Sequence, residues 1–206
     1  MGKLVVVVGP SGVGKTTLVN VLSRLGQFST AYEEHHERPF QVLFNQNKQY
    51  GLANQMDYLI LRAEQEKELR LSDRVGLIDG GLDLDYHGFT RLFHARGWLS
   101  DAEFDLCRRF YELTRQLLPP PDLIVHLTAG EEVLRARLAA RRRINIASAE
   151  DTVVFNHFLI DWLMSVPSGR LVSLDVSTEE KEFHSSMAMI INRLEGLDPH
   201  DLSSTI

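Results

Sequence analysis

Residues 4–17 read LVVVVGPSGVGKTT and contain the strongest indication of the fold. The first five residues, Leu4 to Val8, form a continuous apolar run, which is typical of a parallel strand that helices cover on both faces. The next eight, Gly9 to Thr16, fit the pattern G-x-x-x-x-G-K-[ST] without a mismatch. A helix is predicted from about Lys15 to Leu25, with Gly26 as its stop. Strand, glycine-rich turn and helix in this order predict a loop that binds the phosphates of a nucleotide.

Each part of this loop has a chemical role. The glycines let the backbone curl so that successive N–H groups point at one anion, and the dipole of the following helix favours the same negative charge. Lys15 supplies a cation for the β- and γ-phosphates, and Thr16 offers a hydroxyl to Mg²⁺. The predicted nucleotide contacts from this segment are Gly9, Pro10, Ser11, Gly12, Val13, Gly14, Lys15, Thr16 and Thr17.

Strands and helices alternate along the rest of the chain. Further strands are predicted at residues 29–33, 75–79, 122–127 and 170–174, and a capping box at Ser100–Glu103 opens a helix that runs to Leu118. A second capping box is predicted at Thr128–Glu131, before a helix that ends in an arginine cluster. This order predicts a three-layer, doubly wound α/β fold with a parallel sheet of about five strands, and ligands at the carboxyl ends of those strands.

Asp79 ends the third predicted strand, where a protein with this loop places a carboxylate near the metal. We therefore predict Thr16 and Asp79 as the metal ligands, the alternative being that Asp79 caps the following turn. Residues 1–197 are expected to form a single domain and residues 198–206 a flexible tail.

Composition excludes several classes of protein. The chain has 206 residues with 22 Lys and Arg against 28 Asp and Glu, so its net charge of −6 argues against a nucleic-acid polymer as the main partner. No apolar run approaches the roughly 20 residues of a membrane helix, so no membrane partner is expected. The single cysteine, Cys107, cannot form an internal disulfide, and we expect a reducing, cytoplasmic location.

The loop alone does not say how the nucleotide is used. The chain has no N-K-x-D guanine-reading motif, so a GTPase is not expected, and it is short for a motor protein. Its small size and the late arginine cluster favour a kinase that acts on a small molecule.

Several motifs, in order and spacing, resemble the deoxynucleoside kinases, and the bacterial deoxyadenosine/deoxyguanosine kinase branch most of all. The resemblance covers roughly the first 165 residues. The motifs that carry it are Tyr32-Glu33-Glu34, Arg38-Pro39-Phe40, residues 43–50 (LFNQNKQY), Gln55 with Tyr58 and Arg62, Asp79 with Asp85, residues 121–127 (PDLIVHL) and residues 137–143 (RLAARRR).

The resemblance implies an enzyme that requires ATP and Mg²⁺ and transfers the γ-phosphoryl group to the 5′-hydroxyl of a nucleoside. Glu33 matches the catalytic base that takes the proton from this hydroxyl, since a carboxylate within hydrogen-bond reach suits that task. Gln55 and Asp85 match positions that read the base, and Phe44 falls where a tyrosine often reaches the sugar.

The resemblance also implies a lid over about residues 137–150. Arg137 would contact the nucleotide there, while Arg141 and Arg143 would close over the transferring phosphoryl group as catalytic residues. From the residues alone, these arginines could instead form a basic helix end that complements the helix dipole. The family is often dimeric, and the predicted helices at 52–71 and 101–118 are the candidates for the contact.

Some positions depart from the family pattern. Asp79-Gly80-Gly81 stands where the family usually carries Asp/Glu-Arg-Ser, so an arginine that would lie beside the reacting 5′-oxygen is missing. Two other functions stay open, the first because it shares the loop and the lid and the second because of Gly80. One is a nucleoside monophosphate kinase, such as a thymidylate kinase, with Arg38 and Arg62 as cations for the acceptor's phosphate. The other is a nucleotide-binding regulatory protein with weakened catalysis.

Overall fold

The computed structural model describes residues 1–31, 38–139, 149–178 and 182–196. Within these ranges five strands form one parallel sheet, in the order β2-β3-β1-β4-β5. This confirms the predicted α/β fold with a five-stranded parallel sheet. The strands are β1 (Leu4–Val8), β2 (Phe28–Ala31), β3 (Val75–Asp79), β4 (Leu123–Thr128) and β5 (Leu171–Asp175).

The central strand β1 explains the continuous apolar run of the sequence. Val5 and Val7 point into a hydrophobic cluster on one face of the sheet, and Leu4, Val6 and Val8 into a cluster on the other. All five side chains are essentially inaccessible to solvent. A strand covered on both faces needs apolar residues at every position. For this reason β1 lacks the alternation of apolar and polar residues that is typical of a strand with one exposed face.

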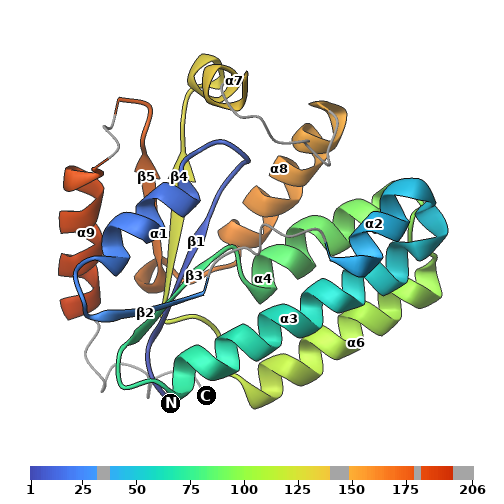
Figure 1. Cartoon of the computed structure of the whole chain (residues 1–206), viewed down its shortest axis with the longest axis horizontal. Coiled ribbons are helices and arrows are strands. Elements are labelled where there is room, and N and C mark those ends of the chain that lie inside the picture. Colours follow the sequence, from blue (N-terminus) through green and yellow to red (C-terminus); the bar gives the residue numbers. More distant parts are fainter. Residues whose placement is uncertain (32–37, 140–148, 179–181, 197–206) are drawn as a thin grey trace.

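Helices cover both faces of the sheet (Figure 1). The nine α-helices among the described residues are α1 (Lys15–Ser23), α2 (Pro39–Gln46), α3 (Gly51–Leu71), α4 (Leu82–Leu84), α5 (Arg91–Ala95), α6 (Asp101–Leu117), α7 (Glu131–Ala139), α8 (Ala149–Met164) and α9 (His184–Glu195). Short 3₁₀ helices lie at η1 (Lys48–Tyr50) and η3 (Ser168–Arg170), and a π-helix, η2 (Asp85–Thr90), joins α4 to α5. The segments α2, α4 to α5 and α8 were not among the helices expected from the sequence.

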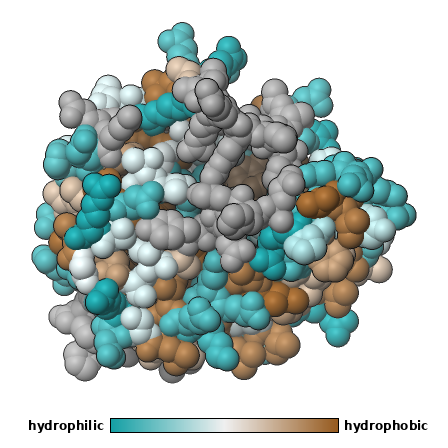
Figure 2. All heavy atoms as spheres, viewed as in Figure 1, coloured by the Kyte–Doolittle hydropathy of each residue, from teal (hydrophilic) through white to brown (hydrophobic). Residues whose placement is uncertain are grey.

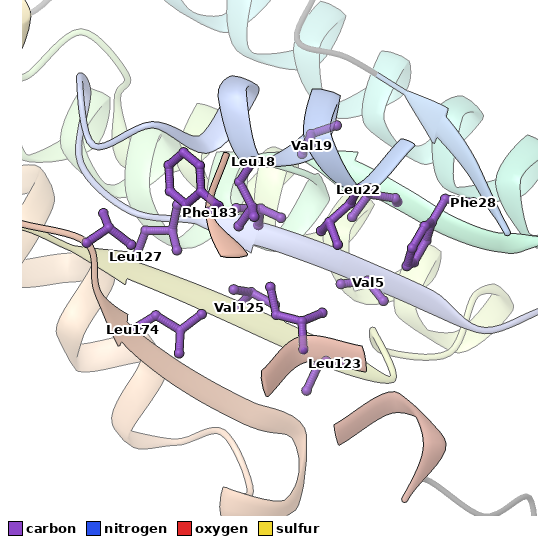
Figure 3. Packing of buried hydrophobic residues seen from close by; sticks show 14 of the residues in the cluster. Val5, Leu18, Val19, Leu22, Phe28, Leu123, Val125, Leu127, Leu174 and Phe183 are labelled. Atoms are coloured by element: carbon purple, nitrogen blue, oxygen red, sulfur yellow. The ribbon is translucent and has the colours of Figure 1, made fainter. Parts of the chain in front are cut away.

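One face of the sheet packs on α1 and α9. Leu18 and Leu22 of α1 lie against Val5 and Val125 of the sheet, and Phe183, just before α9, closes the cluster near the glycine-rich loop (Figure 3). The other face packs on α8 and on the segment from α4 to α5. A third cluster, which contains Cys107, lies between α3 and α6. The three layers are therefore two sets of helices and the sheet between them.

The two predicted capping boxes have different outcomes. The Ser100 hydroxyl accepts from the backbone N–H of Glu103, and the Glu103 carboxylate accepts from the backbone N–H of Ser100, so the box at α6 is confirmed. The prediction of a capping box at Thr128 is wrong. Thr128 is the last residue of β4, its hydroxyl donates to the Leu174 carbonyl of β5, and α7 begins only after Gly130. Strand pairing, which local sequence does not reveal, takes precedence over the capping pattern.

Candidate active site

The glycine-rich loop runs from the end of β1 to the start of α1. Gly9, Gly12 and Gly14 have φ angles of 145°, 84° and 114°, a region that side chains with a Cβ rarely adopt. A Cβ on Gly9 would lie 2.4 Å from the Leu127 carbonyl oxygen. Glycine at these positions therefore allows the tight curl that directs backbone N–H groups at an anion. Helix α1 begins directly after Gly14, so its positive dipole end lies at the same place.

The loop's two functional side chains have defined partners. The Lys15 ammonium donates to the carbonyl oxygens of Gly9 and Pro10, at 3.0 and 3.2 Å. The Thr16 hydroxyl donates to the Asp79 carboxylate at 2.5 Å, and Asp79 is completely buried. The structure thus brings together the two residues that the sequence predicts as metal ligands.

The chemistry of this pair fits Mg²⁺, which prefers oxygen ligands and is usually held by one or two carboxylates together with substrate phosphates. Over the described residues there is no group of three or more His, Cys, Asp or Glu side chains arranged to hold a metal ion. Thr16 and Asp79 could hold such a metal together with the nucleotide's own phosphate oxygens.

Arg137 of α7 lies against the loop. Its guanidinium donates to the Val13 carbonyl oxygen at 2.8 Å and to the Val176 carbonyl oxygen, just after β5, at 2.9 Å. Arg137, which the sequence predicts as a nucleotide contact, thus links α7 to the loop and to the residue after β5 through two backbone carbonyl oxygens. Three predicted catalytic residues lie outside the residues that the structure describes: Glu33, Arg141 and Arg143.

A buried polar cluster lies between α3 and η2. The Gln55 amide donates to the Asp85 backbone carbonyl at 3.2 Å, and the Arg62 Nε donates to the Asp85 carboxylate at 2.9 Å. The Thr90 hydroxyl donates to the same Asp85 carbonyl at 3.1 Å. All four residues are at most 4% exposed. The structure therefore brings Gln55 and Asp85 together, and their role in reading a base stays a prediction.

Sequence reasoning did not place Arg62 and Thr90 in this cluster. Arg62 follows Gln55 by seven residues, which is two helical turns, so both side chains project from the same face of α3. That spacing is a signal that could have linked them. Thr90 had no such signal, because its contact depends on the π-helix, whose wider turns bring residue 90 onto the carbonyl of residue 85.

Phe44 lies in an aromatic cluster rather than among polar groups. Its ring stacks on Phe93 at 4.7 Å between centroids, meets Trp98 edge-on at 5.4 Å, and is 1% exposed. The Lys48 ammonium lies 3.8 Å from the centre of the same ring. The contact of Phe44 with the sugar stays a prediction.

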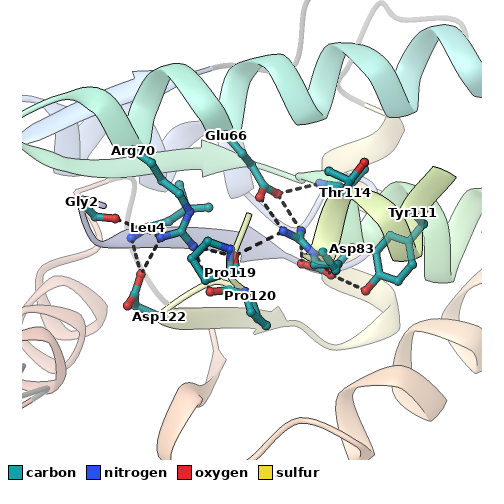
Figure 4. A network of polar contacts seen from close by, with 12 residues as sticks. Gly2, Leu4, Glu66, Arg70, Asp83, Tyr111, Thr114, Pro119, Pro120 and Asp122 are labelled. Atoms are coloured by element: carbon teal, nitrogen blue, oxygen red, sulfur yellow. Dashed lines mark hydrogen bonds and ion pairs between the residues drawn. The ribbon is translucent and has the colours of Figure 1, made fainter. Parts of the chain in front are cut away.

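A network of buried charges supports the segment that carries Asp85 (Figure 4). Arg115 of α6 bonds the carboxylates of Glu66 and Asp83 at 2.8 Å each. The Tyr111 hydroxyl donates to Asp83 at 2.6 Å and lies 3.1 Å from Nε2 of His87. Burial lowers the pKa of His87 from 6.5 to about 4, and burial together with Asp83 raises the pKa of Tyr111. His87 is therefore neutral at pH 7 and fixed on the side of η2 that faces α6.

These features define a class of protein. A glycine-rich loop after the first strand of a parallel sheet, with a strand-end carboxylate bonded to the loop's threonine, is the arrangement of a P-loop phosphotransferase fold. The deoxynucleoside kinase family model matches residues 5–157. The chain belongs to the deoxynucleoside kinase family.

Individual relatives agree with this assignment. The chain is 27% identical over 143 residues to a deoxyadenosine kinase of Dictyostelium discoideum, a match that covers 69% of this chain and 58% of that protein. It is 29% identical over 136 residues to a deoxyguanosine kinase of Bacillus subtilis, covering 66% of this chain and 65% of that protein. The chain thus spans less than two thirds of the length of these two relatives.

A solved structure shares the fold. The deoxyadenosine kinase from M. mycoides with bound dATP superposes with a TM-score of 0.74 at 18% identity, covering 93% of this chain and 99% of that chain.

None of the helices in the described part of the chain combines the length and apolar character needed to cross a membrane.

Proposed function

We propose that this protein transfers the γ-phosphoryl group of ATP to the 5′-hydroxyl of a deoxynucleoside. The observation that carries this proposal is the pairing of a phosphate-binding loop, with its Thr16–Asp79 contact, and a buried polar cluster around Asp85 in one fold. The names of the relatives, deoxyadenosine kinase and deoxyguanosine kinase, support a purine deoxynucleoside as the acceptor.

In this proposal the loop amides and Lys15 hold the ATP phosphates, and Thr16 and Asp79 would hold Mg²⁺, which supplies charge neutralisation for the transferring group. Glu33 takes the proton of the 5′-hydroxyl. Arg141 and Arg143 stabilise the charge that develops on the phosphoryl oxygens. Arg137 keeps the loop in position through its bond to Val13.

The acceptor's base is proposed to meet Gln55 and Asp85, with Phe44 near the sugar. An amide offers one acceptor oxygen and two donor hydrogens, and one hydrogen of Gln55 already bonds the Asp85 carbonyl. The remaining donor and acceptor suit a base edge that presents an acceptor next to a donor. Adenine has such an edge.

The arginine contacts favour a nucleoside over a monophosphate as the acceptor. A monophosphate kinase needs a cation for the acceptor's phosphate, and Arg38 and Arg62 are the candidates. Arg38 makes two bonds to the Asp57 carboxylate, at 2.5 and 2.7 Å, and Arg62 bonds Asp85. Each guanidinium is thus compensated by a carboxylate, which suits an uncharged acceptor.

The test is a transfer assay with radiolabelled ATP over a panel of deoxynucleosides and nucleoside monophosphates. We expect transfer to purine deoxynucleosides and none to monophosphates.

Two variants test the proposed catalytic residues. Lys15→Ala and Glu33→Gln should each reduce kcat by about 1,000-fold or more, because the first removes a cation that binds phosphate and the second removes the carboxylate that takes the hydroxyl proton. Circular dichroism should show both variants folded. Transfer to monophosphates alone would establish the alternative kinase, and tight ATP binding without any turnover would establish the regulatory protein.

The proposal includes a molecular context. We infer a cytoplasmic homodimer whose subunits meet through α3 and α6, and a single kinase domain over residues 1–197 with a lid at about 137–150. On α6, Leu106, Leu113 and Leu117 are 43%, 56% and 67% exposed on one face. Hydrophobic side chains also gather on the face seen in Figure 2, at the lower right where α3 and α6 lie. An exposed leucine stripe of this kind is typical of a surface that a partner covers.

A further inference from the structure

A cavity of about 550 Å³ lies at the amino edge of the sheet. Its lining includes Pro121, which comes shortly before β4, and Arg170, which directly precedes β5. The glycine-rich loop follows the carboxyl end of β1, and β1 pairs with β4 in parallel, so the loop and the cavity lie at opposite edges of the sheet. The volume is in the range of sites that bind small organic molecules.

Three aromatic rings that contact one another line this cavity. The imidazole of His87 stacks on the indole of Trp162, with 5.4 Å between the ring centroids and 5° between the ring planes. The same imidazole meets the ring of Tyr111 edge-on at 5.2 Å. Apolar side chains make up much of the remaining lining: Pro120, Pro121, Ile124, Val166 and Pro167. Aromatic rings pack well on one another, so this lining suits a ligand with a flat, apolar body.

The charged side chains of the lining leave one positive charge without a partner. Asp83 and Arg115 form an ion pair at 2.8 Å, and Glu112 accepts from Arg108 at 2.8 Å. The guanidinium of Arg170 forms no hydrogen bond or ion pair within the described part of the chain. A guanidinium presents a planar fork of N–H donors that binds a carboxylate through two parallel hydrogen bonds. The free charge in this cavity therefore favours an anionic ligand.

The same lining restricts the anion to a single negative charge. A phosphate monoester carries nearly two charges at pH 7, and it would meet one free cation while the carboxylates of Asp83 and Glu112 repel it. A carboxylate carries one charge, which Arg170 alone can compensate. We propose that this cavity binds a small aromatic carboxylate, with its ring against Trp162, His87 and Tyr111 and its carboxylate on Arg170. The inference does not depend on the proposed function.

The test is isothermal titration calorimetry of the full chain with benzoate, benzamide and acetate. Benzoate should bind with a Kd below about 1 mM. Benzamide keeps the ring but has no charge, and acetate keeps the charge but has no ring, so each should bind at least about 10-fold more weakly. Saturating ATP and Mg²⁺ should leave the Kd for benzoate unchanged, because the glycine-rich loop lies at the other edge of the sheet.

Three variants locate the binding site of benzoate. Arg170→Gln should weaken its binding by about 10-fold, since a hydrogen-bonded charge is lost. Gln116→Glu adds a negative charge at an exposed position of the lining and should weaken binding by about 3-fold or more. Arg74→Gln is the matched control, because Arg74 is exposed and does not line the cavity, so this variant should keep the wild-type Kd. Circular dichroism would show whether each variant is folded.

The inference is overturned if benzoate shows no saturable binding, or if benzamide or acetate binds as tightly as benzoate does. Displacement of benzoate by ATP would place the probe in the candidate active site and would also overturn it. Equal affinities of Arg170→Gln and Arg74→Gln for benzoate have the same meaning. If Arg170→Gln does not fold, the comparison of Gln116→Glu with Arg74→Gln decides in its place. Phosphoryl transfer is measured separately, so failure of this inference leaves the proposed function untouched.

Discussion

Single residues determine the shape of the phosphate-binding loop, and Gly14 is the clearest case. Its φ of 114° lies in the region that glycine favours, and a Cβ there would lie 2.9 Å from Cζ of Phe183. Phe183 is buried, and its own φ of 52° is the one positive value among the described non-glycine residues. The loop is therefore held between the curl of its own glycines and an aromatic ring from the start of α9.

Replacing Gly14 with alanine should weaken ATP binding by at least about 10-fold and lower the free energy of unfolding by about 2 kcal/mol, because left-handed strain and the contact with Phe183 add up. Nucleotide titration followed by fluorescence and urea unfolding would measure the two effects. Gly26→Ala is the matched control, since it carries a similar strain without a neighbour. The reasoning fails if Gly14→Ala binds ATP as tightly as Gly26→Ala does.

Among the elements, the π-helix η2 has the most direct bearing on the candidate site. Its first residue, Asp85, has a carbonyl that accepts from both Gln55 and Thr90, and a carboxylate that accepts from Arg62. The charge network of Glu66, Asp83 and Arg115 holds the preceding turn in place. Asp85 is thus positioned from α3, from its own helix and from α6.

Thr90→Val removes one of these bonds without changing the volume. The lost hydrogen bond should lower stability by about 1 kcal/mol and raise KM for the nucleoside several-fold, with KM for ATP unchanged. Thr114→Val is the control, because the Thr114 hydroxyl donates to the Phe110 carbonyl in α6 in the same way but away from Asp85. Thr114→Val should lower stability in the same way and leave KM for the nucleoside unchanged. Identical KM values in the two variants would contradict a positioning role for Thr90.

At the scale of the whole molecule, stability should depend on the neutral state of His87. Its pKa is about 4 in the folded chain against 6.5 when unfolded. Because the pKa of His87 is lower in the folded chain than in the unfolded chain, the unfolded chain takes up the proton at a higher pH as the solution is acidified. The free energy of unfolding should therefore fall as pH drops from about 6.5 to 4, by at most about 3 kcal/mol.

His87→Gln keeps a donor for Tyr111 but does not titrate. Urea unfolding of both proteins at several pH values between 7 and 4 should give a smaller loss of stability for the variant. The difference between wild type and variant isolates His87 from the other titrating groups. Equal slopes for the two proteins would show that His87 is protonated in the fold as readily as in the unfolded chain.

The leucine stripe on α6 leads to a prediction about assembly. Leu113→Glu places a charge at the centre of this face and should shift the proposed dimer to monomer, because a buried unpaired carboxylate destabilises an interface by several kcal/mol. Sedimentation at two protein concentrations would measure this. Val153→Glu, at a 70% exposed position on α8, should leave the dimer intact. A monomeric wild type would contradict the proposed assembly.

Local features of the protein could be predicted from the amino-acid sequence alone. It was sufficient for β1, for the loop after it, for the alternation of strands and helices, and for the capping box at Ser100, because each of these depends on residues that are neighbours in the chain. The sequence also predicted that Thr16 and Asp79 lie near each other, because both follow strands at the carboxyl edge of a parallel sheet.

Other contacts between residues far apart in the chain could not be predicted in this way. The strand order, the burial of Phe44 among aromatic rings, the role of Thr128 in β4, and the approach of Arg62 to Gly80 all depend on how elements far apart in the chain pack together. Hydrophobic periodicity fixes which face of an element is buried, but it carries no information on what that face is buried against. The glycine pair after β3 was visible in the sequence, and its relation to an arginine on α3 exists only in three dimensions.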